Sequence, residues 1–363
     1  MKFGNDSSVT VENNGENHGI MVGTNYGSMI IQNQYGLGYN ETKSLCLDIV
    51  RDALSKYRAD ALIEAQKRSE KLLEDVVQKL NNKRMTDTQA LSEFRTPSMQ
   101  IDYLEAQKAY IKVGTPELAE MLSDILVERI SEPYRSPLQI ALSEAIQVAP
   151  KLSQLQMAEL ALAFVLSYTH DSTVTTYQSF SEFLRNKIIL LFDSGIAYRV
   201  TGSHHFDFTG CSQYSVNKKS LIQLLKETYT GIFMAGFYKD EIPKAKSGHS
   251  LFDIYPLFIP CPYNRGKIQI NVMTNKLLSQ QIQKLSMPLE DATILRKLFD
   301  ENVLPDNQAQ ELVEKLAPDM RKVFEYWESS EISHYLLTDI GIIIGAEYAH
   351  QITGEKYKLS WWV

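Results

Sequence analysis

The residues best suited to chemistry lie together in one short segment of the chain. His204 and His205 adjoin Asp207, and Cys211 follows four residues later. Imidazole, carboxylate and thiol groups are metal ligands, and they also serve as bases and nucleophiles in hydrolases. In an extended segment, His205 and Asp207 would point to the same side of the backbone. The pattern predicts either His205 as a base oriented by Asp207, or Cys211 as a nucleophile activated by a histidine.

The other interpretation of this segment is purely structural. Adjacent histidines are common in surface loops, and no second ligand pair with matching spacing appears in the chain. The three cysteines, Cys46, Cys211 and Cys261, lie far apart and include no Cys-x-x-Cys pair, which is the usual signature of a structural zinc site. We therefore predict no metal and no cofactor, favour the structural interpretation, and keep catalysis as the alternative.

Two further pairs combine a histidine with a carboxylate. His170 and Asp171 stand in a polar loop after a strongly apolar segment, and such a loop can line a pocket. Glu347 and His350 are three residues apart and share one face of a helix, a spacing that metal-binding bundles use together with carboxylates from other helices. We expect Asp171 to act as a cap in a solvated loop, and Glu347 to contact His350 structurally.

Several enzyme classes lack their signatures in this chain. Neither a GxxxxGK[ST] loop nor GxGxxG is present, which disfavours P-loop motors and dinucleotide binding. The GxSxG elbow of α/β-hydrolases is also missing. A nuclease core of the Asp…Glu-x-Lys kind is also not indicated. Asp253 precedes one strand, but the next strand reads Gln-Ile-Asn at 269–271 and so lacks the required glutamate and lysine.

The N-terminal segment contains an eight-residue repeat. Each unit is an Asn-x-Gly turn followed by a short apolar run. A fixed period of turn and strand indicates one small β unit used several times, and a single hairpin is marginal in water. Stacked copies from several chains would form Asn ladders and dry apolar contacts. We predict homo-oligomerisation through residues 9–36, with a weakly ordered arm or packing on the chain's own body as alternatives. The assembly residues are Asn17, Gly19, Met21, Asn25, Gly27, Met29 and Asn33.

This repeat resembles the N-termini of bacterial proteins linked to immunity and programmed-death signalling, where such segments are amyloid-like assembly motifs. The body resembles an uncharacterised bacterial protein family in ELAEMLSDILVERI (117–130), in the segment ending PLFIPC (256–261), and in DIGIIIGAEYAHQITGE (339–355) with its KLSWWV tail. These are packing motifs, so the resemblance implies a fold and a link to antiviral defence but transfers no catalytic residue.

Composition limits the remaining function classes. The chain has 363 residues, 44% hydrophobic and 22% charged, which is ordinary for a globular protein. A net charge of −7 gives no global attraction to nucleic acid. The most apolar segment, 340–346, is too short to span a membrane, and its Gly341 and Gly345 would permit close approach of a neighbouring part of the chain. The N-terminus lacks a signal-peptide core, so we expect a cytoplasmic protein.

The expected fold is mainly α: a multi-helical body with a small β insertion and an N-terminal short β-repeat arm. We divide the chain into an arm (1–40), a helical region with a long first helix (41–170) and an α+β C-terminal region (171–363). Proline-initiated helices are expected from 97, 116 and 137, and a central helix over 153–168. A loose hairpin is expected over 195–209, a strand pair over 253–273, and a last helix over 335–353.

These patterns favour a self-associating interaction or signalling protein. The β-repeat would self-associate or act as a template for a protein partner. The helical body would sense a signal or transmit it. The alternative is an effector enzyme, hydrolase or nuclease-like, that uses His204, His205, Asp207 and Cys211. A third interpretation is a structural subunit of a larger complex. Trp361 and Trp362 are expected to anchor the C-terminal segment in the core.

Overall fold

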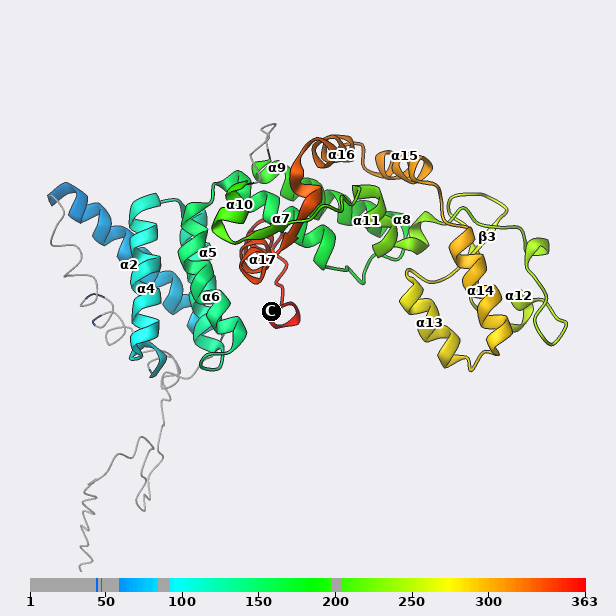
Figure 1. Cartoon of the computed structure of the whole chain (residues 1–363), viewed down its shortest axis with the longest axis horizontal. Coiled ribbons are helices and arrows are strands. Elements are labelled where there is room, and N and C mark those ends of the chain that lie inside the picture. Colours follow the sequence, from blue (N-terminus) through cyan, green and yellow to red (C-terminus); the bar gives the residue numbers. More distant parts are fainter. Residues whose placement is uncertain (1–43, 45–46, 48–58, 84–91, 197–203) are drawn as a thin grey trace, which may run out of the picture.

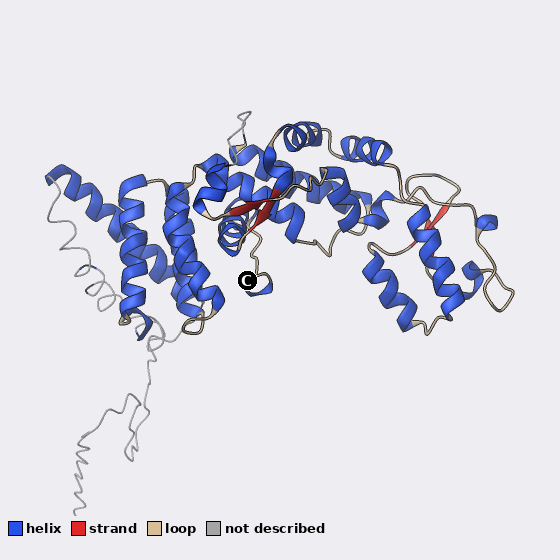
Figure 2. Ribbon diagram, in the orientation of Figure 1, coloured by secondary structure: helices blue, strands red, loops and turns tan. Residues whose placement is uncertain are grey.

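The computed structural model describes residues 44, 47, 59–83, 92–196 and 204–363. These residues form an elongated, mainly α-helical molecule with two short antiparallel strand pairs, as predicted (Figures 1 and 2). The β-repeat arm with its seven assembly residues, and most of the first half of the helix expected over 41–80, lie outside the described residues. No helix of the described part is long and apolar enough to cross a membrane.

Four helices pack together at one end of the molecule (Figure 1). The second half of the expected long first helix packs on this body through a stripe that includes Leu72, Val76 and Leu80. The four helices are α2 (Ala59–Asn82), α4 (Pro97–Val113), α5 (Pro116–Ser131) and α6 (Pro137–Val148).

The boundaries of α4, α5 and α6 follow from local chemistry. Each helix begins with proline after a threonine or serine. The Thr96 hydroxyl accepts a hydrogen bond from the Met99 amide at 3.2 Å, and the Ser136 hydroxyl accepts one from the Gln139 amide at 3.1 Å. Helix α4 ends at Gly114, whose φ of 78° suits a left-handed C-cap. The predicted starts of these helices are therefore confirmed.

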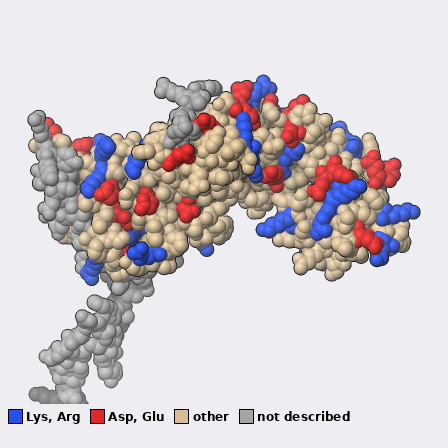
Figure 3. Space-filling model, in the orientation of Figure 1, with Lys and Arg blue, Asp and Glu red and all other residues tan. Residues whose placement is uncertain are grey.

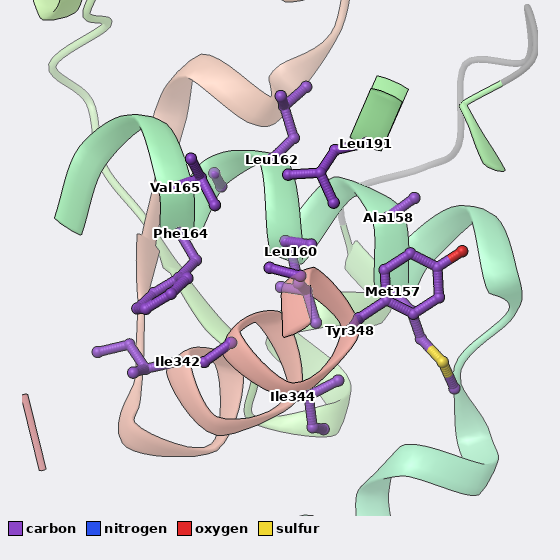
Figure 4. Packing of buried hydrophobic residues seen from close by; sticks show 14 of the residues in the cluster. Met157, Ala158, Leu160, Leu162, Phe164, Val165, Leu191, Ile342, Ile344 and Tyr348 are labelled. Atoms are coloured by element: carbon purple, nitrogen blue, oxygen red, sulfur yellow. The ribbon is translucent and has the colours of Figure 1, made fainter. Parts of the chain in front are cut away.

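The centre of the core is the contact between α7 (Gln154–Tyr168) and α17 (Asp339–Thr353). Ile342, Ile344 and Tyr348 of α17 lie beside apolar side chains of α7 (Figure 4). Gly345 brings α17 close to α7, and Gly341 brings α17 close to the backbone of Cys211. A Cβ at Gly345 would lie 2.7 Å from the Leu160 carbonyl oxygen, and one at Gly341 would overlap the Cys211 carbonyl oxygen. The predicted close approach at these glycines is confirmed.

Further helical segments continue from α7 along the molecule (Figure 1). One helical run spans 177–195, and its middle, η2, has π-helical bonding. The segments are α8 (Tyr177–Phe183), η2 (Leu184–Ile189), α9 (Leu190–Gly195), α11 (Leu221–Thr228), α15 (Asp306–Leu316) and α16 (Met320–Ser329).

One strand pair was not predicted. Strand β1 (Ser212–Tyr214) pairs with β4 (Tyr335–Leu337) in antiparallel register, Ser212 opposite Leu337. The last helix was expected to begin at residue 335, but it begins at Asp339 after β4. Thr338 explains the start, because its hydroxyl accepts a hydrogen bond from the Gly341 amide at 3.3 Å.

The second strand pair belongs to a smaller unit with its own hydrophobic cluster, at the far end of the molecule from α2. The strand pair predicted over 253–273 is confirmed, although its strands are shorter than expected. Gly266 adopts a φ of 86° in the turn between the strands. The elements are α12 (Leu251–Ile254), β2 (Phe258–Pro260), β3 (Ile268–Ile270), α13 (Asn275–Lys284) and α14 (Leu289–Glu301).

The larger hydrophobic cluster draws side chains from both sides of residue 170. It joins Leu122 of α5 and Leu160 of α7 to Ile343 of α17. These helices therefore share one core, and the division of the chain at residues 40 and 170 into separate regions stays a prediction.

A buried arginine ties three helices of the first group together. Arg129 of α5 is 1% exposed, and its Nε donates to the Asp102 carboxylate of α4 at 2.6 Å. Ser143 of α6 donates to the same carboxylate at 2.7 Å, and Nη2 of Arg129 donates to Ser98 at 2.8 Å. A buried charge of this kind is tolerated because its hydrogen bonds are satisfied.

We predict that Arg129→Met lowers the free energy of unfolding by about 3–5 kcal/mol, because it leaves the Asp102 carboxylate buried without its cation. Urea unfolding measures the change. The double variant Asp102→Leu, Arg129→Met should be more stable than the single variant, since it leaves no fully buried carboxylate without a cation; Glu93, the other partner of Arg129, is partly exposed to water. A double variant at least as unstable as Arg129→Met would contradict this account.

Gly345→Ala provides a test of the α7–α17 contact. In an exposed helix this change stabilises, since alanine is the better helix former. Here the added methyl group would press on the Leu160 backbone, so we expect a loss of about 1–3 kcal/mol in the free energy of unfolding. Thermal unfolding shows directly whether Gly345→Ala is less or more stable than the wild type. A stabilised variant would show that α7 and α17 can move apart without cost.

Candidate functional site

The segment with His204, His205 and Asp207 is helical, so the expected hairpin is wrong where the structure describes it. Helix α10 spans His204–Thr209, and residues 197–203 lie outside the described part, as does the side chain of His204. The Thr209 hydroxyl donates to the His205 carbonyl at 2.8 Å, and Gly210 ends the helix with a φ of 72°. On a helix, positions 205 and 207 point in different directions.

The structure does not join these candidate residues into one hydrogen-bonded set. Asp207 is exposed, whereas the Nε2 atom of His205 is buried and has no hydrogen-bond partner among the described residues. Cys211 is fully buried, and burial raises the pKa of its thiol, which disfavours the nucleophilic thiolate. Across the described ranges, no three His, Cys, Asp or Glu side chains converge as metal ligands. Catalysis by this set stays a prediction.

Two polar pockets instead flank the segment that follows α17. The first, which we call the α17 pocket, has a volume of about 290 Å³ and lies between α2, α5 and α17. Two of its three lysines are held by acids across the helices, with Lys79 2.7 Å from Asp124 and Lys83 2.5 Å from Glu128. Its lining residues are Lys79, Asn82, Lys83, Asp124, Val127, Glu128, Glu347, His350 and Lys356.

Glu347 and His350 both line this pocket, but the contact expected between them is absent: no hydrogen bond or ion pair joins them in the described structure. Burial raises the pKa of the Glu347 carboxyl from 4.5 to about 8, and the nearby Asp124 and Glu128 add to the shift. Glu347 is therefore mostly protonated at neutral pH and can donate a hydrogen bond. The Nδ1 atom of His350 is buried and unpartnered among the described residues.

The second pocket, which we call the aromatic pocket, has a volume of about 480 Å³. It lies where the end of α7, the following loop, η2 and the segment after α17 meet. This pocket brings together two features that the sequence presented separately, His170-Asp171 and Trp361-Trp362. Its lining residues are Tyr168, Thr169, His170, Asp171, Lys187, Glu355, Lys356, Tyr357, Lys358, Trp361 and Trp362.

Asp171 has the local capping role expected for it, and it also holds a lysine. Its Oδ1 accepts a hydrogen bond from the Thr173 amide at 2.9 Å, and its Oδ2 accepts one from Lys187 at 2.7 Å. Lys187 is also paired with Glu355. Burial alone would lower the pKa of Lys187, but its bonds to Asp171 and Glu355 raise it overall. Lys187 is thus a protonated lysine whose charge is compensated by Asp171 and Glu355 and which links the loop after α7 to the segment after α17.

The two tryptophans have different roles. Trp362 anchors the C-terminal segment as predicted, because its indole Nε1 donates to the Tyr168 carbonyl at 2.8 Å and its ring meets Phe164 edge-on at 5.1 Å. Trp361 does not, since its side chain is 73% exposed at the edge of the aromatic pocket.

Sequence reasoning missed the lysines of the aromatic pocket. Lys356 and Lys358 form no ion pair among the described residues, and Lys356 lines both pockets. The sequence did contain a signal for them. Lys356 and Lys358 flank Tyr357, and positions two apart in an extended segment point to the same side. Lys187 carried no such signal, because its partners Asp171 and Glu355 are distant in the sequence.

These features define a mainly helical protein with two polar pockets and, in the part that the structure describes, no assembled metal-binding cluster. The chain belongs to a family of uncharacterised proteins, whose family model matches residues 36–363. The resemblance of the body to such a family is thereby confirmed. No curated protein and no solved structure matches the chain.

Glu347→Gln tests the electrostatics of the α17 pocket. A carboxyl whose folded-state pKa is raised makes the protein less stable as pH rises from 4.5 to about 8, since the unfolded chain loses the proton first. The side chain keeps partial contact with water, so we discount the shift and expect the variant to be more stable near neutral pH by about 1–3 kcal/mol.

The measurement is urea unfolding of both proteins across this pH window. The two curves should converge as the pH falls below 4.5, because Glu347 is then mostly protonated in both states. Glu311→Gln, at an exposed position of α15, is the matched control and should leave the pH dependence unchanged. Parallel curves for wild type and Glu347→Gln would show that this carboxyl titrates normally.

Proposed function

We propose that this protein is a self-associating interaction and signalling protein. Residues 9–36 form its assembly element, and copies of the chain pair through the Asn-x-Gly repeat. The helical body presents surfaces and pockets that sense a ligand or a protein partner. The observation that carries the proposal is the eight-residue repeat, in which asparagine, glycine and methionine recur in step at seven positions.

The family match supports treating the repeat as a separate element. It begins at residue 36, so that all seven assembly residues precede it. The match thus covers the helical body and leaves the repeat outside it. A β segment that cannot build a core alone gains one by stacking on further copies.

The body also offers apolar contact surface. Phe208 of α10, Tyr214 of β1 and Leu336 of β4 are exposed on three neighbouring elements. In the register of β1 and β4, Tyr214 lies opposite Tyr335 and Leu336 lies opposite Gln213, so Tyr214 and Leu336 face opposite sides of the strand pair. They are separate exposed apolar contacts and not one patch. Charges of both signs intermingle on the face seen in Figure 3, which favours a protein or small-molecule partner over nucleic acid.

We further propose that the protein acts in the bacterial cytoplasm, in antiviral defence. The resemblance of the repeat to bacterial signalling motifs supports the defence role. Cys211 and Cys261 are free, buried thiols, which suits a reducing compartment. The alternative of an effector enzyme has less support, because His205, Asp207 and Cys211 share no hydrogen bond in the described structure.

The test is the mass in solution, measured by light scattering across a concentration series. The matched control is a full-length chain in which residues 13–36 are shuffled, since it keeps length and composition but destroys the period. We expect the natural chain to be a multimer and the shuffled chain to have a lower mass. The chain starting at Glu41 should behave like the shuffled one, and equal masses for all three would refute assembly through the repeat.

A further inference from the structure

The aromatic pocket is suited to a ligand that the assembly proposal does not require. Its volume of about 480 Å³ lies within the range of small-molecule sites, which is about 300–1,000 Å³. Four of its lining residues carry large aromatic rings and three carry ammonium groups. Such a combination of flat apolar walls and cations is the composition that planar, anionic ligands need.

The charges of the pocket are not balanced uniformly. Lys187 is neutralised by Asp171 and Glu355, so it contributes rigidity rather than free charge. Lys356 and Lys358 have no carboxylate partner within ion-pair distance among the described residues. The pocket therefore has two lysines among its lining residues whose charges no ion pair compensates.

Trp361 is the second feature of the pocket that the packing of the protein does not explain. Trp361 is 73% exposed although it lines the pocket. The centre of its ring lies 5.8 Å from that of Trp362, whose own ring is fixed by contacts with Tyr168 and Phe164. An exposed indole beside a fixed aromatic wall and two free lysines offers a face on which a flat ring can stack. Its exposure adds nothing to the packing of the core.

We propose that the aromatic pocket binds a mononucleotide, with the base stacked on Trp361 and the phosphate held by Lys356 and Lys358. Thr169 and His170 supply polar groups at the pocket wall for the edge of the base. A polynucleotide fits less well, because it needs a basic track over many phosphates and the net charge of the chain is −7. The proposal is independent of the N-terminal repeat.

Calorimetric titration of the full chain with AMP, GMP, CMP and UMP tests the proposal. Adenosine and ribose 5-phosphate serve as the half-ligands that lack the phosphate or the base. We expect at least one mononucleotide to bind about tenfold more tightly than either half-ligand, with an affinity that falls as salt rises. No binding with a Kd below about 1 mM for all four mononucleotides would overturn the proposal.

Variants then assign the contacts. Trp361→Ala should weaken binding about tenfold, whereas Trp361→Phe should retain most of it because the stacking face remains. The double variant Lys356→Gln, Lys358→Gln should bind about tenfold more weakly and lose most of the salt dependence. Both sites are exposed or unpaired, so the fold should persist, as circular dichroism would verify.

Matched controls lie in the smaller unit with its own hydrophobic cluster, away from the pocket. Tyr238 is a 51% exposed aromatic residue of this unit, and Lys297 is an exposed lysine of α14. Tyr238→Ala and Lys297→Gln should leave the affinity unchanged. If the controls weaken binding as much as the pocket variants do, or if the pocket variants bind normally, the ligand binds elsewhere and the assignment is wrong. A short oligonucleotide that binds more tightly than every mononucleotide would also overturn it.

Discussion

The rest of the structure depends on how closely α17 approaches α7. Gly345 lets the backbone of Leu160 lie where any side chain would collide, and Gly341 does the same for Cys211. Because α17 also packs on α5, α6 and α9, this one approach places most of the core helices relative to one another. It also determines where the segment after α17 leaves the core, and both pockets are built around that segment.

Charge compensation separates the structural parts of the protein from the parts available for binding. Arg129 and Asp102 satisfy one another between helices, and Lys187 is held by two carboxylates. Such groups stabilise one arrangement because leaving either partner alone is costly. Glu347 is the carboxyl kept neutral by burial, and Lys356 and Lys358 are cations without a carboxylate partner among the described residues. These exceptions gather in the two pockets, where a ligand would complete them.

Local chemistry explains which parts of the fold were predictable. The helices after Thr96, Thr115 and Ser136 could be predicted from proline and capping residues, because those signals act within one turn. Strand β1 could not, because its partner β4 is more than a hundred residues away. The segment at 204–209 misled because Phe206 and Phe208 alternate as in a strand. In the helix one is buried against Tyr335 and the other is 84% exposed. The pockets depend on residues brought together by tertiary packing, which spacing alone does not reveal.

Lys356 lines both pockets, so that they share one cation. In the α17 pocket its positive charge partly opposes the rise in the pKa of Glu347. An anion bound to Lys356 from the other side would screen that charge, and Glu347 would then hold its proton more tightly. Thermodynamic linkage would make this relation reciprocal. Occupancy of one pocket would thus favour proton uptake at the other, with a single lysine side chain as the connection.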